Sequence, residues 1–318
     1  MKKYANDMNS LGDKLVFTSF GESHGAAVGG VLDGVPSGVA IDMPLVRHEL
    51  VRRSGRGAEG VSARASREPD EVEWLSGVTE KDGVLVTLGT PVAFIIRNAD
   101  ARPEDYEVLR HTFRPGHADF VYEAKYGIRD WRGGGRASAR ETAARVVAGS
   151  VVRPLLAEKG IEISAELVQV GEERDKARFE ALLREIKGDG DSVGGIVSCT
   201  VTGLAAGAGE PVFDKLQARL AYAVMSINGC KGFEYGTGFE GVALRGSEIW
   251  HPGEAPSPAS GGIEGGISNG LPLSFRCVFK PAATIGKLYK GRHDACIAVR
   301  AVPVVEAMTA LTIADFVL

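Results

Sequence analysis

The sequence has few cysteines and no long apolar run, and each absence excludes a class of protein. The four cysteines, Cys199, Cys230, Cys277 and Cys296, form no CxxC pair and have no histidine at metal-ligand spacing. They predict reduced thiols, buried or near the surface, and neither a disulfide framework nor a zinc site. No segment approaches the ~20 apolar residues of a membrane span, and the N-terminus lacks the apolar core of a signal peptide. We therefore expect a cytosolic (cytoplasmic) protein without a membrane partner.

A large excess of charge of one sign is also missing. The 37 basic and 41 acidic residues give a formal net charge of −4, and 44% of the residues are hydrophobic. That fraction is enough for a sizeable core, which excludes a disordered chain. We find no internal repeat and no domain boundary. We expect residues 1–318 to form a single domain, with residues 1–13 as a loosely ordered N-terminal extension.

Runs rich in Val and Ile, bounded by glycine or aspartate turns, predict strands. The expected strands span residues 14–19, 27–33, 83–88, 92–97, 161–170 and 194–202. Along the sequence these strands follow one another in pairs, with a helix only after each pair. This order favours antiparallel or mixed sheets over a repeating βαβ pattern and predicts the α+β class.

Helix starts are indicated at three places. Asp42, two residues before a proline, predicts a helix through residue 52. Ser138 and Glu141 form a capping box for a helix running towards residue 159, and Pro154 should kink or break that helix. Pro303 is expected to open a C-terminal helix.

Arginines gather in two clusters in which lysine is nearly absent. The clusters are Arg47, Arg52, Arg53, Arg56, Arg64 and Arg67, and then Arg110, Arg114, Arg129, Arg132, Arg136 and Arg140. The planar guanidinium suits bidentate contacts to phosphate or carboxylate, so the clusters predict a site for a small anion. Solvated faces with surface ion pairs are the alternative for any single arginine. Residues 132–136 also resemble an RGG fragment, but one copy in an acidic chain does not favour nucleic-acid binding.

Glycine is abundant, with 42 residues in 318, nearly twice the average of about 7%. Residues 133–138 place three glycines directly before the capping box, where free helix amides could cradle a phosphate. The segment fits neither the Walker nor the Rossmann pattern, which disfavours an enzyme that uses a nucleoside triphosphate. Residues 261–270 are half glycine and could approach a flat ligand or form a mobile surface loop.

Two of the six histidines lie where catalytic groups concentrate. His24 sits at a turn after a strand, and His117 sits in a loop among arginines. Arginine neighbours favour a neutral imidazole that can exchange a proton near pH 7. His48 and His251 are better explained as structural or exposed. The residues alone leave each role open.

Four segments can be interpreted together. They are Phe17–Gly25 (FTSFGESHG), Phe113–Asp119 (FRPGHAD), Gly133–Thr142 (GGGRASARET) and Gly291–Cys296 (GRHDAC), with Gly207–Asp214 and Met225–Asn228 in the same motif order. Through them the chain closely resembles the chorismate synthases, from about Phe17 to the C-terminus. The resemblance implies a carbon–oxygen lyase of the shikimate pathway. It would convert 5-enolpyruvylshikimate 3-phosphate to chorismate by anti 1,4-elimination of phosphate, using reduced FMN (FMNH2) without net redox change.

The resemblance also implies roles for residues of this chain. His24 would donate a proton to the departing phosphate, His117 would serve the reduced flavin, and Asp294 would help to remove the ring proton. Arg53 and Arg136 would contact anions, with Arg53 binding substrate or NADP. The implied FMN-binding residues are Arg136, Ala137, Ser138, Asn228, Gly229, Gly265, Lys280, Pro281, Ala282, Ala283, Thr284 and Arg292.

The family's architecture is a β-α-β sandwich in one domain, and the usual assembly is a homotetramer. No segment remains for a fused flavin reductase, so the resemblance implies an external reductant. Ala282 and Ala283 replace residues that usually carry hydroxyls, so only their backbone could contact a flavin. A binding protein that kept the fold but lost flavin-dependent catalysis is the alternative.

Overall fold

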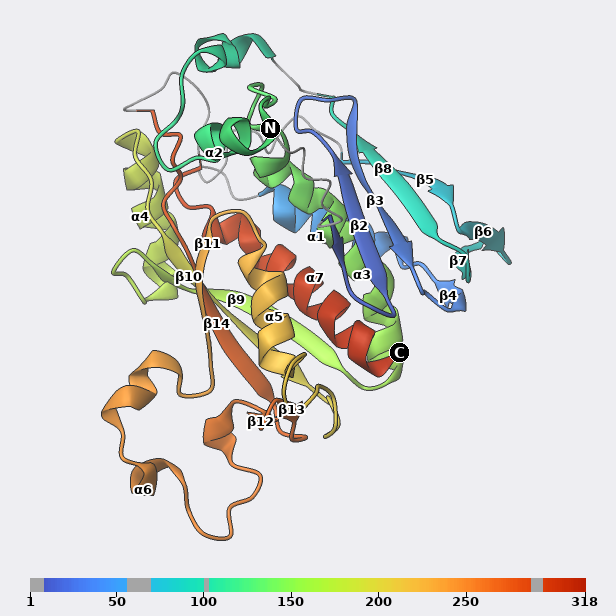
Figure 1. Cartoon of the computed structure of the whole chain (residues 1–318), viewed down its shortest axis with the longest axis vertical. Coiled ribbons are helices and arrows are strands. Elements are labelled where there is room, and N and C mark those ends of the chain that lie inside the picture. The colour runs from blue at the N-terminus through green and yellow to red at the C-terminus, as the bar shows by residue number, and fades with distance from the viewer. Residues whose placement is uncertain (1–8, 56–69, 100–102, 287–293) are drawn as a thin grey trace.

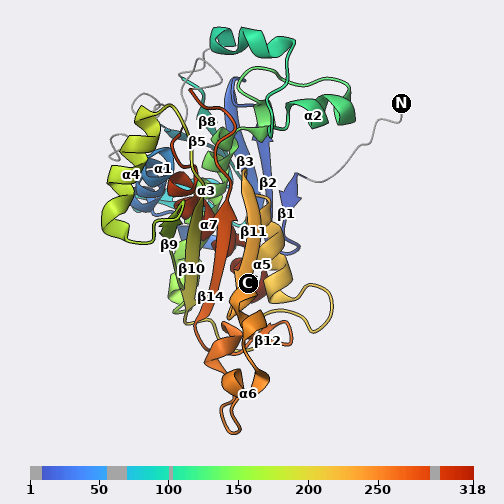
Figure 2. The ribbon, with the colours of Figure 1, turned by 90° about the vertical axis from the view of Figure 1, so that its left-hand side faces the viewer.

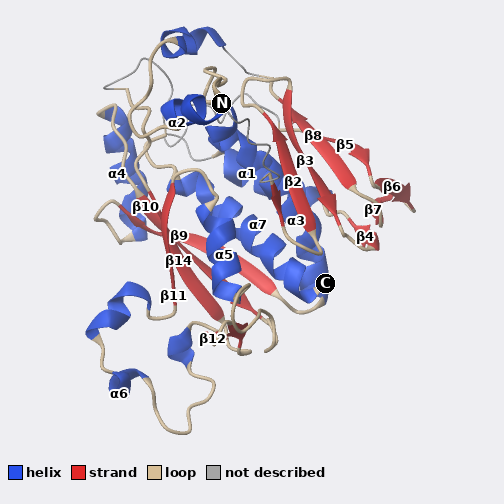
Figure 3. Cartoon of the chain, viewed as in Figure 1, coloured by secondary structure: helices blue, strands red, loops and turns tan. Residues whose placement is uncertain are grey.

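Two antiparallel sheets enclose a layer of helices in the computed structural model, which describes residues 9–55, 70–99, 103–286 and 294–318 (Figures 1 and 3). One sheet has the order β1 (Ser10–Leu11), β2 (Val16–Gly21), β3 (Ala27–Asp33), β8 (Val92–Arg97), β5 (Val72–Ser76). The other has the order β11 (Cys230–Tyr235), β14 (Leu273–Phe279), β10 (Gly195–Thr202), β9 (Glu162–Val170). Two small sheets complete the set: β4 (Ser37–Ala40), β7 (Val84–Leu88) and β6 (Val78–Lys81), and the pair β12 (Ile263–Glu264) and β13 (Ile267–Ser268).

The helices lie mainly between and beside these sheets. The α-helices are α1 (Met43–Ser54), α2 (Asp119–Tyr126), α3 (Thr142–Glu158), α4 (Lys176–Gly188), α5 (Leu216–Met225), α6 (Gly246–Ile249) and α7 (Ala298–Val317). Short 3₁₀ helices are η1 (Pro103–Arg110), η2 (Gly135–Ala137), η3 (Ala139–Glu141), η4 (Gly238–Ala243) and η5 (Pro258–Ser260). In the layer, α3 packs against β3 and α7, and α7 packs against β9 and β10 (Figure 2). The result is the α+β sandwich expected from the sequence.

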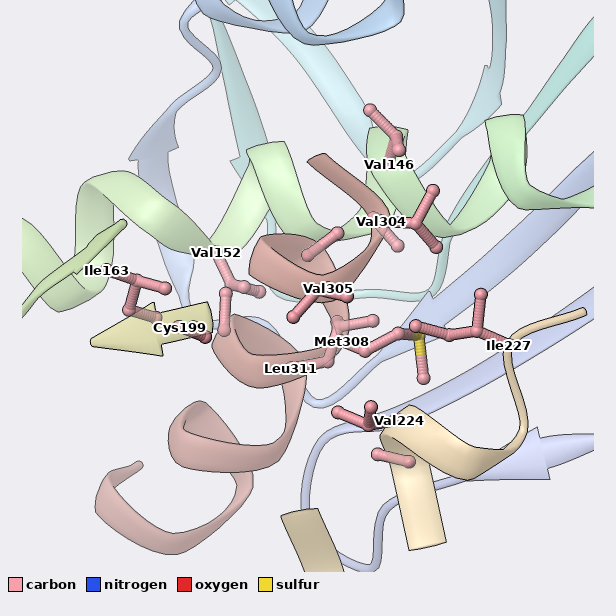
Figure 4. Packing of buried hydrophobic residues seen from close by; sticks show 14 of the residues in the cluster. Val146, Val152, Ile163, Cys199, Val224, Ile227, Val304, Val305, Met308 and Leu311 are labelled. Carbon is pink, nitrogen blue, oxygen red and sulfur yellow. The ribbon is translucent and has the colours of Figure 1, made fainter. Parts of the chain in front are cut away.

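The hydrophobic core follows the contact between α3 and α7. Val152 of α3 and Val305 and Leu311 of α7 are buried among apolar side chains from both sheets (Figure 4). Gly149 of α3 lies directly against α7, since a Cβ there would come within 2.5 Å of Ala307 Cα. This close approach leaves little water-accessible apolar surface in the layer, and such burial is the dominant favourable term in folding.

Several local expectations are confirmed. The strands at residues 27–33 and 92–97 coincide with β3 and β8, and the side chain of Asp42 caps α1 by accepting from Leu45 N at 2.9 Å. The four cysteines are free and buried.

Among the helices of residues 9–55, 70–99, 103–286 and 294–318, none combines the length and the apolar character that a membrane span requires.

One helix prediction from proline is wrong, because α7 begins at Ala298 with Pro303 inside it. At Pro154 the helix α3 does not break but continues to Glu158, and the alternative of a kink stays a prediction. Proline removes one backbone hydrogen bond from a helix interior, at a cost of about 3 kcal/mol. Most residues of α3 and α7 are buried, and their apolar burial outweighs that local cost.

The N-terminal segment is held more firmly than expected. In β1, Ser10 and Leu11 pair with β2. The carboxylate of Asp315, near the end of α7, accepts from the backbone N–H groups of Asp13, Lys14 and Leu15 at 3.0, 2.7 and 2.8 Å. Ser10, Leu11 and Asp13, within the expected N-terminal extension, are therefore hydrogen-bonded to the rest of the fold, and residues 1–8 lie outside the described residues.

Candidate active site

A cavity of about 240 Å³ lies where seven segments of the chain meet. Its walls come from the end of α1, η1, residues 114–117, the glycine-rich segment with its following helix, residues 227–229, residues 280–284 and the start of α7. It brings together these residues predicted from the sequence: Arg53, His117, Ala137, Ser138, Asn228, Gly229, Lys280, Ala282, Ala283, Thr284 and Asp294. Arg53 and Asp294, 241 positions apart in the sequence, therefore share one pocket.

The pocket is rich in positive charge. Its described lining includes the cations Arg53, Arg114, Arg140, Lys280 and Arg300, against the carboxylates of Asp70 and Asp294. Cations outnumber carboxylates in a partly enclosed space, where charges interact more strongly than in bulk water. The arrangement favours an anionic ligand.

Arg53 and Asp70 form a buried ion pair in this wall. Arg53 Nη2 donates to Asp70 Oδ2 at 2.8 Å, and Arg140 Nη1 donates to Asp70 Oδ1. Burial raises the pKa of the Asp70 carboxyl, but both arginines outweigh burial and leave that pKa lowered. Burial lowers the pKa of Arg53 to about 10, against the attraction of Asp70, so Arg53 remains a cation at neutral pH. Its Nε is buried and has no hydrogen-bond partner among the described residues.

The segments predicted to contact a flavin are hydrogen-bonded to one another. Asn228 Nδ2 donates to Ala137 O at 3.0 Å, and the backbone N–H of Lys280 donates to Gly229 O at 3.0 Å. Lys280 Nζ reaches across to donate to Gly116 O, and burial lowers the pKa of this lysine. Asn228 Oδ1 is buried and accepts no hydrogen bond from the described residues. The wall thus holds an acceptor that is free for a ligand.

The glycine-rich segment makes a tight turn, and two histidines lie against it. Gly133 and Gly134 have φ of +62° and +88°, in the left-handed region that favours glycine. A Cβ at Gly133 would overlap the ring of His24, and one at Gly134 would lie 2.6 Å from Cε1 of His117. After this turn the Ser138 side chain accepts from Arg140 N at 3.3 Å and caps η3, which leads into α3. The Ser138 half of the predicted capping box is therefore present, at η3. The other half is not, because the Ser138 N–H donates to Gly135 O at 3.2 Å and the Glu141 carboxylate accepts from Arg145 Nε at 3.2 Å; α3 itself begins at Thr142.

Asp294 is held by an arginine that sequence analysis did not single out. Arg300 Nη1 donates to Asp294 Oδ2 at 2.8 Å, and Arg300 Nε donates to the backbone oxygen of Arg53 at 2.9 Å. One side chain of α7 therefore fixes both a carboxylate and the end of α1 at the pocket.

Some predicted residues lie outside this lining. His24 is buried behind it, 4.9 Å from the ring of Tyr106, which lines the pocket together with Gly133. Arg136 Nη2 donates to Ser19 Oγ at 2.7 Å, which turns the side chain towards β2. Pro281 is absent from the lining, and Arg292 lies outside the described residues. Gly265 lines a second cavity, next to β11 and β12.

Five charged or aromatic residues of the pocket were not predicted from the sequence or were given no role. Asp70, Tyr106 and Arg300 carried no local signal, because each meets its partner only in the folded chain. Arg114 and Arg140 were noticed as members of a cluster, and their spacing could not indicate that they bind Asp119 and Asp70.

The fold is of the α+β class, and the cationic pocket beside its helix layer is a candidate active site for an anionic ligand. The sequence profile of one family, "Chorismate synthase", matches residues 15–318. Chorismate synthases from Christiangramia forsetii and Phocaeicola vulgatus are 45% and 44% identical to the chain, covering 98% of it and 97% and 98% of their own lengths. A crystal structure of chorismate synthase superposes with a TM-score of 0.74 at 30% identity, over 96% of this chain and 92% of that chain. The chain belongs to the chorismate synthase family.

Family membership gives the activity. The chain is a carbon–oxygen lyase that eliminates phosphate from 5-enolpyruvylshikimate 3-phosphate to form chorismate, in the shikimate pathway of aromatic amino acid biosynthesis. The family uses a flavin in general. None of these findings favours the alternative of a binding protein without catalysis.

Proposed function

We propose that this elimination takes place in the pocket around Arg53 and Asn228, with reduced FMN as the flavin. The observation that carries the proposal is a pair of buried polar atoms without partners among the described residues, Arg53 Nε and Asn228 Oδ1. Buried polar groups are normally hydrogen-bonded, so each atom suits a ligand group. Arg53 Nε is a donor for a phosphate oxygen, and Asn228 Oδ1 accepts from N–H or O–H groups of the kind a flavin carries. The residues present therefore fit the cofactor.

FMN would be held by Ala137, Ser138, Asn228, Gly229 and the segment Lys280–Thr284, with Arg136, Gly265 and Arg292 proposed from the resemblance alone. Ala282 and Ala283 can offer only backbone groups, while Thr284 keeps a hydroxyl that accepts from Arg114 Nη1 at 3.4 Å. When bound, reduced FMN would supply electron density that eases cleavage of the C–O bond.

The chain's own residues would then divide the remaining chemistry. Arg53 and its cationic neighbours would neutralise the charge of the departing phosphate. A proton for the phosphate from His24 is proposed from the resemblance alone, since His24 does not line the pocket. Asp294, fixed by Arg300, takes the ring proton. His117 would give or accept a proton beside the bound flavin.

The assembly and setting are part of the same proposal. We propose one domain for the chain, supported by a single hydrophobic cluster that includes both large sheets. Exposed Phe213, Phe239 and Val242, at 85%, 77% and 93% exposure, support association of several copies, and we propose a homotetramer. A cytoplasmic location and an external flavin reductant, with NADP as a source of electrons, complete the proposal.

The test is anaerobic turnover with photoreduced FMN, followed by chorismate absorbance. We expect product only with reduced flavin, and loss of product when Asn228→Ala weakens FMN binding in a separate titration. Full turnover without added flavin would contradict the proposal.

A further inference from the structure

Asp119, the first residue of α2, has a buried carboxylate, and both of its oxygens accept hydrogen bonds. Its side chain is 2% exposed. Oδ2 accepts from the backbone N–H of Arg114 at 3.1 Å and from its Nε at 2.8 Å. Oδ1 accepts from Arg114 Nη2 at 2.9 Å and from His117 Nδ1 at 2.8 Å. Burial raises the pKa of this carboxyl, but the hydrogen bonds from Arg114 and His117 outweigh burial and hold it well below its usual range. Asp119 is therefore ionised at neutral pH.

This geometry decides which ring nitrogen of His117 carries hydrogen. An ionised carboxylate oxygen can only accept, so His117 Nδ1 must donate. Arg114 Nη2 lies 3.1 Å from the same Nδ1 because both atoms donate to Oδ1 of Asp119. In the neutral imidazole, Nε2 then holds the lone pair.

The other edge of the ring faces the pocket wall. His117 lines the cavity, its side chain is 17% exposed, and none of the described residues hydrogen-bonds its Nε2. The Cε1–Nε2 edge lies against Gly134, where a Cβ would be 3.0 Å from Nε2. The charged groups around this loop are Arg114 and Asp119 from the loop and α2, and Lys280, whose Nζ donates to Gly116 O from the segment proposed to bind FMN.

We propose that Asp119 and Arg114 are positioning residues that hold His117 as the Nδ1–H tautomer and present Nε2 as a proton acceptor at the pocket. The proposal deepens the function proposed above, because it concerns the histidine assigned there to the flavin. Arg114 locks the carboxylate through three hydrogen bonds, and the carboxylate orients the imidazole. Such a carboxylate–histidine pair fixes both the ring's tautomer and its direction.

The first test needs no substitution. Nitrogen-15 spectra of histidine-labelled, flavin-free protein, with His117 assigned by its loss in His117→Gln, should show a protonated Nδ1 and an unprotonated Nε2 in the neutral ring. A neutral His117 protonated at Nε2 would overturn the proposal.

The second test is Asp119→Asn. The backbone N–H and Nε of Arg114 both point at the Oδ2 position, so the amide oxygen should lie there and the amide NH₂ should face His117 Nδ1. His117 should switch to the Nε2–H tautomer, and turnover with prereduced FMN should fall by about 10²- to 10⁴-fold.

The matched control is Glu123→Gln, on the same helix. Glu123 accepts from Arg129 Nε at 2.9 Å, and its side chain is 46% exposed. We expect an unchanged His117 tautomer and turnover within about twofold of the parent. An Asp119→Asn protein that keeps the Nδ1–H tautomer, or the turnover of the control, would refute the proposal.

A folding defect, or a failure of the proposed function, can be distinguished from a failure of the positioning proposal. If Asp119→Asn fails to fold by circular dichroism, the tautomer in the parent protein decides the question. If the parent shows the Nδ1–H tautomer but no flavin-dependent turnover, the proposed function fails and the positioning of His117 stands.

Discussion

Replacing Gly134 by alanine tests whether position 134 requires glycine because the ring of His117 packs against it. The substitution has two separable effects. Alanine at φ +88° adds a left-handed backbone penalty of about 1–2 kcal/mol. Its Cβ would also lie 2.6 Å from Cε1 of His117, about 1 Å closer than the 3.5–4.0 Å of ordinary carbon contacts. The ring is held by Asp119, so either the ring or the segment must move.

The expected magnitudes follow from these two effects. Overpacking adds about 1–3 kcal/mol to the backbone penalty, and a shift of about 1 Å at a reacting group can lower turnover by about 10²-fold. Gly160→Ala is the control, because its φ of +74° is similar and a Cβ there meets nothing within 4 Å. Gly160→Ala should be destabilised only by the left-handed backbone penalty of about 1–2 kcal/mol and should keep its turnover.

Urea unfolding followed by circular dichroism would measure the stability of both variants, and anaerobic chorismate formation would measure turnover. Equal destabilisation of the two variants, together with full turnover in Gly134→Ala, would refute the reasoning.

Three further predictions follow from the structure. Asp294→Asn should bind FMN and substrate but lose at least ~10²-fold in turnover as a missing general base, and a loss within about threefold would make Asp294 an ion-pair partner of Arg300 only. Burial raises the pKa of the Glu22 carboxyl; Arg136 lowers this pKa and Asp130 raises it further. The free energy of unfolding should therefore fall as pH rises from the ordinary glutamate pKa through the raised one. In thermal melts, Glu22→Gln should be more stable than the parent at pH 7 and lose that gain near about pH 4. Asp315→Ala leaves three backbone N–H groups without their acceptor and should cost roughly 3 kcal/mol in urea unfolding, whereas Asp13→Ala, on a side chain 73% exposed, should cost less than about 1 kcal/mol.

Local patterns predicted six of the strands and the start of α1, because hydrophobic runs and caps act over a few residues. The strands at residues 27–33 and 92–97 and the cap at Asp42 needed no tertiary information, whereas β11 and β14 of the second sheet were not predicted. Pro303 does not begin α7, and Pro154 does not end α3, because burial in the helix layer outweighs a lost backbone hydrogen bond, and the sequence does not display that burial.

The pocket was predictable where motifs carry it and not elsewhere. His117, Asn228 and Asp294 were expected from motifs, and the structure brings them to one cavity. The partners that orient them, such as Arg300 for Asp294, depend on side-chain directions that only the packed chain defines. The roles of these residues stay predictions until the variants are measured.

The central position of α7 also affects how the chain is made. This helix follows every other element in the sequence, yet α3 and the sheet with β9 and β10 pack against it. About 160 residues separate the ends of α3 and α7, so at roughly 5–20 residues per second a nascent chain waits about 10–30 s before its core can close. During that time α3 can pack against α1 and β3, but the side of α3 that meets α7 stays uncovered, so we expect loss of the residues from Ala298 onward to leave the core open.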